Sequence, residues 1–169
     1  GVAPNCSIMP IKVVSNTGES TTYHLRQGVS YAIKNNADVI NISMGQDIST
    51  GPPQRDWQLE ATILEALRNN IVVVVAAGNE TFEITEDLTP ASVQGVITVS
   101  AVDVNNDLTE YSNYGSYVDI AAPGGSTVNG TDSLLASTYI PPGNYVAMSG
   151  TSMAAPHVAG VAALLKSSF

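Results

Sequence analysis

Hydrophobic positions recur along the chain with two different periods, and segments of the two kinds alternate. Residues 22–37 and 56–70 carry apolar side chains three or four positions apart, which predicts two amphipathic helices. A third, alanine-rich helix is expected to begin close to Ser152, because Pro156 fits only the first turn of a helix or a kink. Short β-branched or wholly apolar runs predict strands at 8–14, 38–44, 71–77, 95–103 and 117–122.

This order of elements indicates an α/β fold with a mostly parallel central sheet and helices on both faces. The run from 71 to 77 contains no polar residue, which suits a strand covered on both sides. The chain has 169 residues, without an internal repeat or a linker-like segment. We therefore expect residues 1–169 to form a single domain.

Composition narrows the possible partners. Six basic and fifteen acidic residues give a net charge of −9, which disfavours nucleic acid and anionic membranes as partners. No apolar run reaches the length of a membrane span, and the single cysteine, Cys6, excludes an internal disulfide. A nucleotide-binding domain is disfavoured because the chain has no glycine-rich phosphate loop.

Two glycine-containing motifs follow neighbouring predicted strands. SMG (Ser43 to Gly45) ends one strand, and AAGNE (Ala76 to Glu80) ends another. Sites in parallel sheets gather at the carboxyl ends of strands, and exposed backbone there can pair with an extended peptide. Each motif alone can also be an ordinary turn between a strand and a loop, and for AAGNE alone the turn is the favoured interpretation.

The sequence GTSMAAPHVAG (Gly150 to Gly160) places Ser152 at the start of the last helix. The amides and the dipole of a helix N-terminus favour developing negative charge, which suits a nucleophile. A serine at such a position is also a frequent helix cap. The motif alone leaves both interpretations open.

The chain resembles the subtilisin-like serine proteases in several segments that follow one another in order. These are IKVVSNTGES, DVINISMG, VVVAAGNE, YVDIAAPGG and MSGTSMAAPHVAGVAALL, which together extend over nearly the whole chain. The resemblance implies a three-layer α/β fold. It also implies that Ser152 is the nucleophile and that Asn79, with the Ser152 N–H, forms an oxyanion hole. The residues implied to bind substrate are Ser43, Met44 and Gly45 along its backbone and Ala76, Ala77 and Gly78 as a wall of the specificity pocket, whose base is also built by residues around Thr89 to Ala91.

A serine nucleophile needs a base, and neither histidine of the chain is expected to serve. His157 lies five positions after Ser152, roughly 140° around the helix. His24 falls in the first amphipathic helix. Asp38, Asp47 and Asp119 each resemble structural positions of the family. The family's Asp-Thr/Ser-Gly and His-Gly-Thr-His segments are absent, and GVAP at the start resembles residues that follow them.

The expectation is therefore the C-terminal portion of a peptidase catalytic domain with its N-terminal part missing, inactive by itself. Such a portion would require that missing part or would self-associate. The alternative is a catalytically dead peptide-binding module that retains the substrate groove. The resemblance further implies peptide or protein substrates, a secreted or extracytoplasmic location, no certain cofactor and a possible role for calcium; no metal ligand is assigned.

Overall fold

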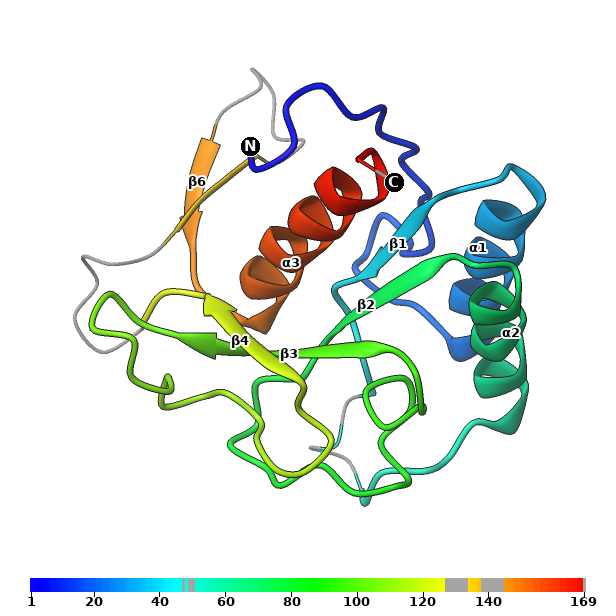
Figure 1. The fold of residues 1–169 in the computed structure, drawn as a ribbon. Helices are drawn as coiled ribbons and strands as arrows, with labels where there is room; N and C mark the ends of the chain where they lie inside the picture. The colour runs from blue at the N-terminus through cyan, green and yellow to red at the C-terminus, as the bar shows by residue number, and fades with distance from the viewer. Residues whose placement is uncertain (47, 49–50, 127–133, 138–144, 169) are drawn as a thin grey trace.

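The structure, a computed structural model, describes residues 1–46, 48, 51–126, 134–137 and 145–168 (Figure 1). Its elements are α1 (Thr22–Lys34), β1 (Val39–Ile42), α2 (Trp57–Arg68), β2 (Val72–Ala76), β3 (Ile97–Val102), β4 (Ile120–Pro123), β5 (Leu134–Ser137), β6 (Tyr145–Met148) and α3 (Thr151–Lys166). None of the helices described is long and apolar enough to cross a membrane.

Four of the strands form one parallel sheet in the order β1-β2-β3-β4. Val39 of β1 pairs with Val72 of β2, and Val74 pairs with Ile97 of β3. Strands β5 and β6, which the hydrophobic pattern does not predict, form a separate antiparallel pair. Because β1 and β2 are parallel neighbours, their carboxyl ends lie at the same edge of the sheet.

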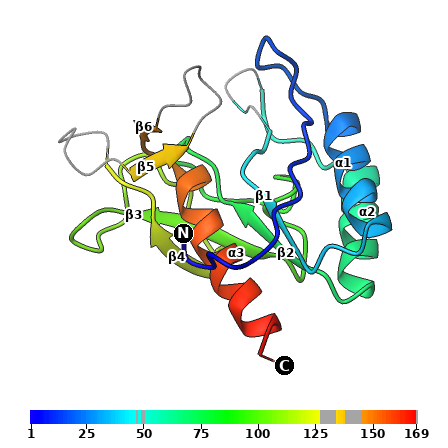
Figure 2. The ribbon, with the colours of Figure 1, turned by 90° about the horizontal axis from the view of Figure 1, so that it is seen from above.

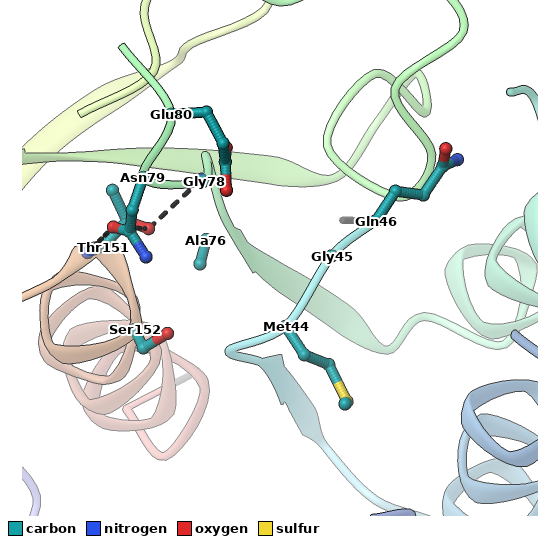
Figure 3. A pocket seen from close by; sticks show the side chains of 9 residues that line it. All are labelled: Met44, Gly45, Gln46, Ala76, Gly78, Asn79, Glu80, Thr151 and Ser152. Atoms are coloured by element: carbon teal, nitrogen blue, oxygen red, sulfur yellow. Dashed lines mark hydrogen bonds between the residues drawn. The ribbon is translucent and has the colours of Figure 1, made fainter. Parts of the chain in front are cut away.

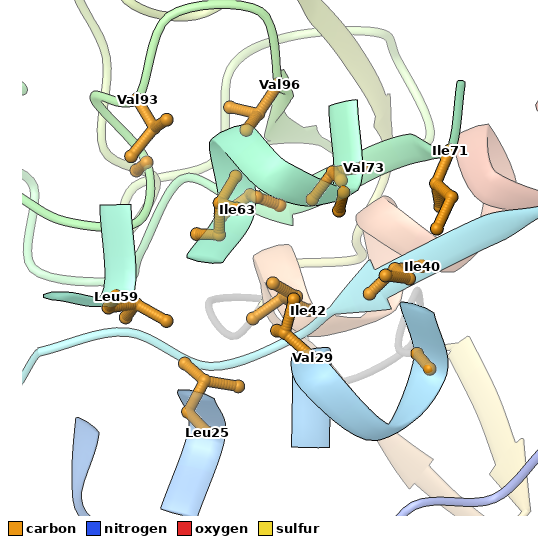
Figure 4. Close-up of a cluster of buried hydrophobic side chains, with 14 of the residues drawn as sticks. Leu25, Val29, Ile40, Ile42, Leu59, Ile63, Ile71, Val73, Val93 and Val96 are labelled. Atoms are coloured by element: carbon orange, nitrogen blue, oxygen red, sulfur yellow. The ribbon is translucent and has the colours of Figure 1, made fainter. Parts of the chain in front are cut away.

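The sheet is the middle of three layers, as predicted. Figures 1 and 2 show α3 on the opposite side of the sheet from α1 and α2. Strand residues alternate between the two sides, so Val73 and Val75 face α1 and α2 whereas Val74 faces α3. The α1 and α2 side holds the larger apolar cluster, shown in Figure 4, and α3 packs through Ala154 and Ala155.

The first two helices begin at side-chain caps. Thr21 Oγ1 accepts the His24 amide at 3.3 Å, and Asp56 Oδ1 accepts two amides, the nearer being Leu59 at 2.9 Å. Both helices end two or three residues before the predicted position. The cause is local, because Asn36 and Asn70 have positive φ angles of 55° and 60°, which an α-helix cannot continue.

The strand predicted at 8–14 is wrong. All seven residues are described, and they form no strand. Instead Ile11 and Val13 pack on α1 at Gly28, where a Cβ would lie only 2.5 Å from Val13 Cγ1. Ile8 is 83% exposed. The β-branched pattern thus reflects one face packed against a helix and not hydrogen-bonded pairing.

Candidate active site

The ends of β1 and β2 and the first turn of α3 line a small open cavity of about 260 Å³. Figure 3 shows the residues that line it: Met44, Gly45, Gln46, Ala76, Gly78, Asn79, Glu80, Thr151 and Ser152. The cavity therefore joins the two glycine-containing motifs to the serine helix. These three sequence segments are far apart in the chain and meet only through the parallel order of the sheet.

Asn79 is held in one orientation by Thr151. The backbone N–H of Thr151 donates to Asn79 Oδ1 at 2.8 Å, and the Thr151 hydroxyl donates to the same oxygen at 3.0 Å. An amide N–H can only donate, so the oxygen of the Asn79 side chain must face Thr151. The NH2 group is consequently turned the other way, towards the side of the cavity that holds Ser152 (Figure 3).

Thr151 links the loop after β2 to α3. Its side chain is fully buried, and its hydroxyl accepts the Gly78 amide at 3.1 Å while donating to Asn79. The sequence predicts no role for Thr151, and its position directly before Ser152 is the only signal of one.

The side chain of Asn113, which is fully buried, also holds the loop after β2 in place. Its Nδ2 donates to the Ala77 carbonyl at 2.9 Å and to the Glu80 carboxylate at 2.7 Å. Its Oδ1 accepts the amides of Glu80 and Phe82 at 3.0 and 2.9 Å. The sequence does not predict this role for Asn113 either, because nothing in its local context marks it as a partner of a loop some 34 residues earlier.

Position 78, in the loop after β2, requires a glycine. It has a φ of +105°, and a Cβ there would lie 2.2 Å from Asn113 Nδ2. Both the backbone conformation and the space therefore demand glycine.

Ser152 is not the cap of α3. The N-cap residue is Gly150, and no side chain makes a capping hydrogen bond. The Ser152 hydroxyl instead donates to the carbonyl oxygen of Ser43 at 3.1 Å. The interpretation of this serine as a helix cap is thereby removed.

The remaining residues expected to contact substrate divide into two groups. Met44, Gly45, Ala76 and Gly78 line the cavity. Ser43 and Ala77 do not line it: Ser43 is hydrogen-bonded to Ser152, and Ala77 is 1% exposed within the larger apolar cluster. The segment from Thr89 to Ala91 is buried, and its Thr89 carbonyl accepts a hydrogen bond from Gln46 at 3.2 Å.

Both histidines make contacts away from the Ser152 hydroxyl. His157 Nδ1 lies 2.8 Å from the Met153 carbonyl, one turn back in α3. His24 Nδ1 lies 3.1 Å from Thr21 Oγ1 at the start of α1.

The two aspartates considered above that the structure describes, Asp38 and Asp119, also form hydrogen bonds to groups other than Ser152. The Asp119 carboxylate accepts the Thr98 amide at 2.8 Å, and the Asp38 carbonyl accepts the Val72 amide. Asp47 lies outside the described residues. Within the described part of the chain, no three His, Cys, Asp or Glu side chains gather as a metal site would require.

Comparison with known proteins gives a family for this arrangement. The model of the subtilase family, Peptidase_S8, matches residues 1–169. The chain belongs to the subtilase family. Among curated subtilases, a thermophilic serine proteinase of Bacillus sp. (strain AK1) is 40% identical over 167 residues, covering 99% of this chain and 37% of that protein. Thermitase of Thermoactinomyces vulgaris is 39% identical, covering 99% of this chain and 54% of its own length.

Solved subtilase structures agree with the fold. A protease from Pseudoalteromonas arctica superposes with a TM-score of 0.87 at 36% identity, covering 99% of this chain and 52% of that one. A cold-adapted subtilisin-like serine proteinase gives a TM-score of 0.81 at 30% identity, covering 99% and 56%. This subtilase chain thus spans roughly half the length of the relatives it matches, from 37% to 57% in the first four curated ones.

Proposed function

We propose that this chain is the C-terminal portion of a serine endopeptidase catalytic domain, folded as one domain, with Ser152 as the nucleophile. Ser152 Oγ attacks the carbonyl carbon of a peptide bond, and the Asn79 NH2 group with the Ser152 N–H receives the negative charge that develops on oxygen. The observation that supports this most directly is the pair of Thr151 donors on Asn79 Oδ1, at 2.8 and 3.0 Å. They leave the NH2 group of Asn79 as a fixed donor beside Ser152, before any substrate arrives.

The proposed substrate is an extended peptide or protein segment. It lies along the backbone of Ser43 to Gly45, with one side chain in the cavity bounded by Met44, Ala76 and Gly78. The sites of proteolytic subtilases are built for peptide substrates, and we propose an extracytoplasmic location for this chain on the same family grounds.

The general base is proposed to lie outside these 169 residues. Both histidines contact other groups, and the Ser43 carbonyl that receives the Ser152 hydroxyl is no proton acceptor at neutral pH. Without a base the hydroxyl is a weak nucleophile. We therefore propose that this chain hydrolyses peptides only together with the remainder of a catalytic domain, joined to it or supplied by a second molecule.

A second candidate is a peptide-binding module that performs no catalysis. It is favoured by the same hydrogen bond from Ser152 to the Ser43 carbonyl, which occupies the hydroxyl in a purely structural contact. In that case the cavity binds peptides and Ser152 contributes no chemistry.

Fluorogenic peptide turnover distinguishes the two candidates. The 169-residue chain is assayed alone and joined to the remaining part of its own catalytic domain, each with Ser152 intact and as Ser152→Ala. We expect turnover only in the joined form, abolished by Ser152→Ala. Asn79→Ala should lower kcat about 10²–10³-fold, the cost of losing one oxyanion donor in a subtilisin.

Peptide binding by the Ser152→Ala variant, measured by fluorescence anisotropy, serves as the control for folding of the groove. Binding without turnover in the joined form would favour the binding module. Strong turnover by the 169-residue chain alone would contradict the placement of the base outside it.

A further inference from the structure

The first turn of α3 is joined to the end of β1 by two reciprocal hydrogen bonds. The Ser152 hydroxyl donates to the carbonyl oxygen of Ser43 at 3.1 Å. The Ser43 hydroxyl donates in return to the carbonyl oxygen of Ser152 at 3.0 Å. Both bonds are partly buried, so water competes with them less than it would at the surface.

The second of these bonds depends on Pro156. In a regular α-helix, the carbonyl of residue 152 accepts the amide N–H of residue 156. Pro156 has no N–H, although it lies inside the helix. The Ser152 carbonyl is therefore left without its helical donor, and Ser43 Oγ supplies one from another element.

The direction of the Ser43 hydroxyl is fixed by a third residue. Asn41 Nδ2 donates to Ser43 Oγ at 2.9 Å. Asn41 and Ser43 are two positions apart at the end of β1, so they share the side of the sheet that faces α3, as Val39 does. With Asn41 donating to the oxygen, the Ser43 hydrogen is left to point at the Ser152 carbonyl.

We propose that Asn41, Ser43 and Pro156 form a relay that holds the backbone of Ser152, and that Ser43 is a positioning residue for this nucleophile. The two reciprocal bonds then have different fates during reaction. The bond from the Ser152 hydroxyl must break when that hydroxyl attacks. The bond to the Ser152 carbonyl involves no reacting atom, so it persists and keeps the backbone N–H and Cβ of Ser152 in place. The role for Ser43 in catalysis rests on the proposed function, whereas the relay itself does not.

A double-mutant cycle on the 169-residue chain tests the relay without any need for activity. Ser43→Ala should raise the equilibrium constant of unfolding about fivefold, the value of one neutral hydrogen bond. In the Pro156→Ala background the new amide of residue 156 can donate to the Ser152 carbonyl, so Ser43→Ala should cost less than about twofold. Ser20→Ala is the matched control, because the Ser20 hydroxyl also donates to a backbone carbonyl, that of Val13, at 2.8 Å.

The control should have the same effect in both backgrounds. Equal effects of Ser43→Ala in both backgrounds would overturn the relay. A second measurement needs no proline variant: the carbonyl ¹³C shift of Ser152 should move upfield in Ser43→Ala and stay unchanged in Ser20→Ala. An unchanged shift in Ser43→Ala would also overturn the relay.

The positioning role is tested in the joined catalytic form. Ser43→Ala should lower kcat about tenfold and leave KM within about twofold, because the backbone groups that pair with substrate are retained. Ser43→Thr, which keeps the hydroxyl, should restore most of kcat. Unchanged kcat in Ser43→Ala would overturn the positioning role. Absence of any turnover dependent on Ser152 would contradict both the proposed function and this role, while the cycle would still decide the relay.

Discussion

Replacing Asn113 by alanine is expected to loosen the loop that carries Asn79. The substitution removes four hydrogen bonds of 2.7 to 3.0 Å from a side chain that is fully buried. At about 1 kcal/mol for each bond, the four bonds together contribute about 4 kcal/mol. Water that enters the vacated space can replace some of the lost hydrogen bonds, since the Glu80 and Phe82 amides lie in a partly buried region. We therefore expect unfolding to become easier by about 3 kcal/mol.

Urea unfolding followed by circular dichroism measures this loss, which corresponds to a fall in melting temperature of about 6–12 °C for a chain of this size. Hydrogen exchange should also localise it, because the amides of Glu80 and Phe82 lose their acceptor while those of β2 do not. Asn105→Ala, in an exposed turn, is the control and should change stability by less than about 0.5 kcal/mol. A loss below about 1 kcal/mol for Asn113→Ala would refute the bracing role.

Three other substitutions test the loop after β2, the apolar core and the cap of α2. Gly78→Ala should lower the free energy of unfolding in urea on the order of 2 kcal/mol, because the new Cβ would clash with Asn113 Nδ2 and because a φ of +105° is unfavourable for alanine. Unaltered stability would contradict this crowding. Ile63→Ala, at a fully buried position, should cost about 2–5 kcal/mol by the same measurement. Hydrogen bonds from Thr22 and from backbone amides lower the pKa of Asp56 below its ordinary 3.8, so its contribution is present above pH 3.8 and is lost as the pH falls through the lowered value. As the pH is lowered, the free energy of unfolding should therefore fall less in Asp56→Asn than in the parent chain. Identical pH dependences of the two chains would count against the role of Asp56 as a cap.

The elements that depend on local sequence were predictable. The apolar period of 3.6 and the capping side chains Thr21 and Asp56 belong to the helices themselves, so α1 and α2 begin where expected. The segment 8–14 shows the limit of such patterns. Alternating β-branched residues report that one face is apolar, but they do not report whether a strand or a helix covers it.

The candidate site was predictable only in part, for a similar reason. Ser152 and Asn79 were named from motifs that resemble a family, and the structure brings both to one cavity. Thr151 and Asn113 hydrogen-bond to residues that are distant in sequence. Thr151 is 72 positions from Asn79, and Asn113 is more than 30 positions from the loop that it contacts. Their hydrogen bonds arise from the parallel order of the strands, which no local pattern contains. The sequence pattern also did not predict the pair β5 and β6.

The position of α3 in the chain affects how the protein is made. Synthesis proceeds from the N-terminus, and α3 follows all four strands of the sheet that it covers. Until α3 has left the ribosome, Val74 and Val99 have no helix over them on that side, although α1 and α2 can already pack on the other. The nascent chain therefore carries a bare apolar sheet face between the synthesis of the strands and that of α3, which makes it a natural client for chaperones. Ser152 lies in the first turn of this helix, so the candidate nucleophile is placed in the same step that covers this face.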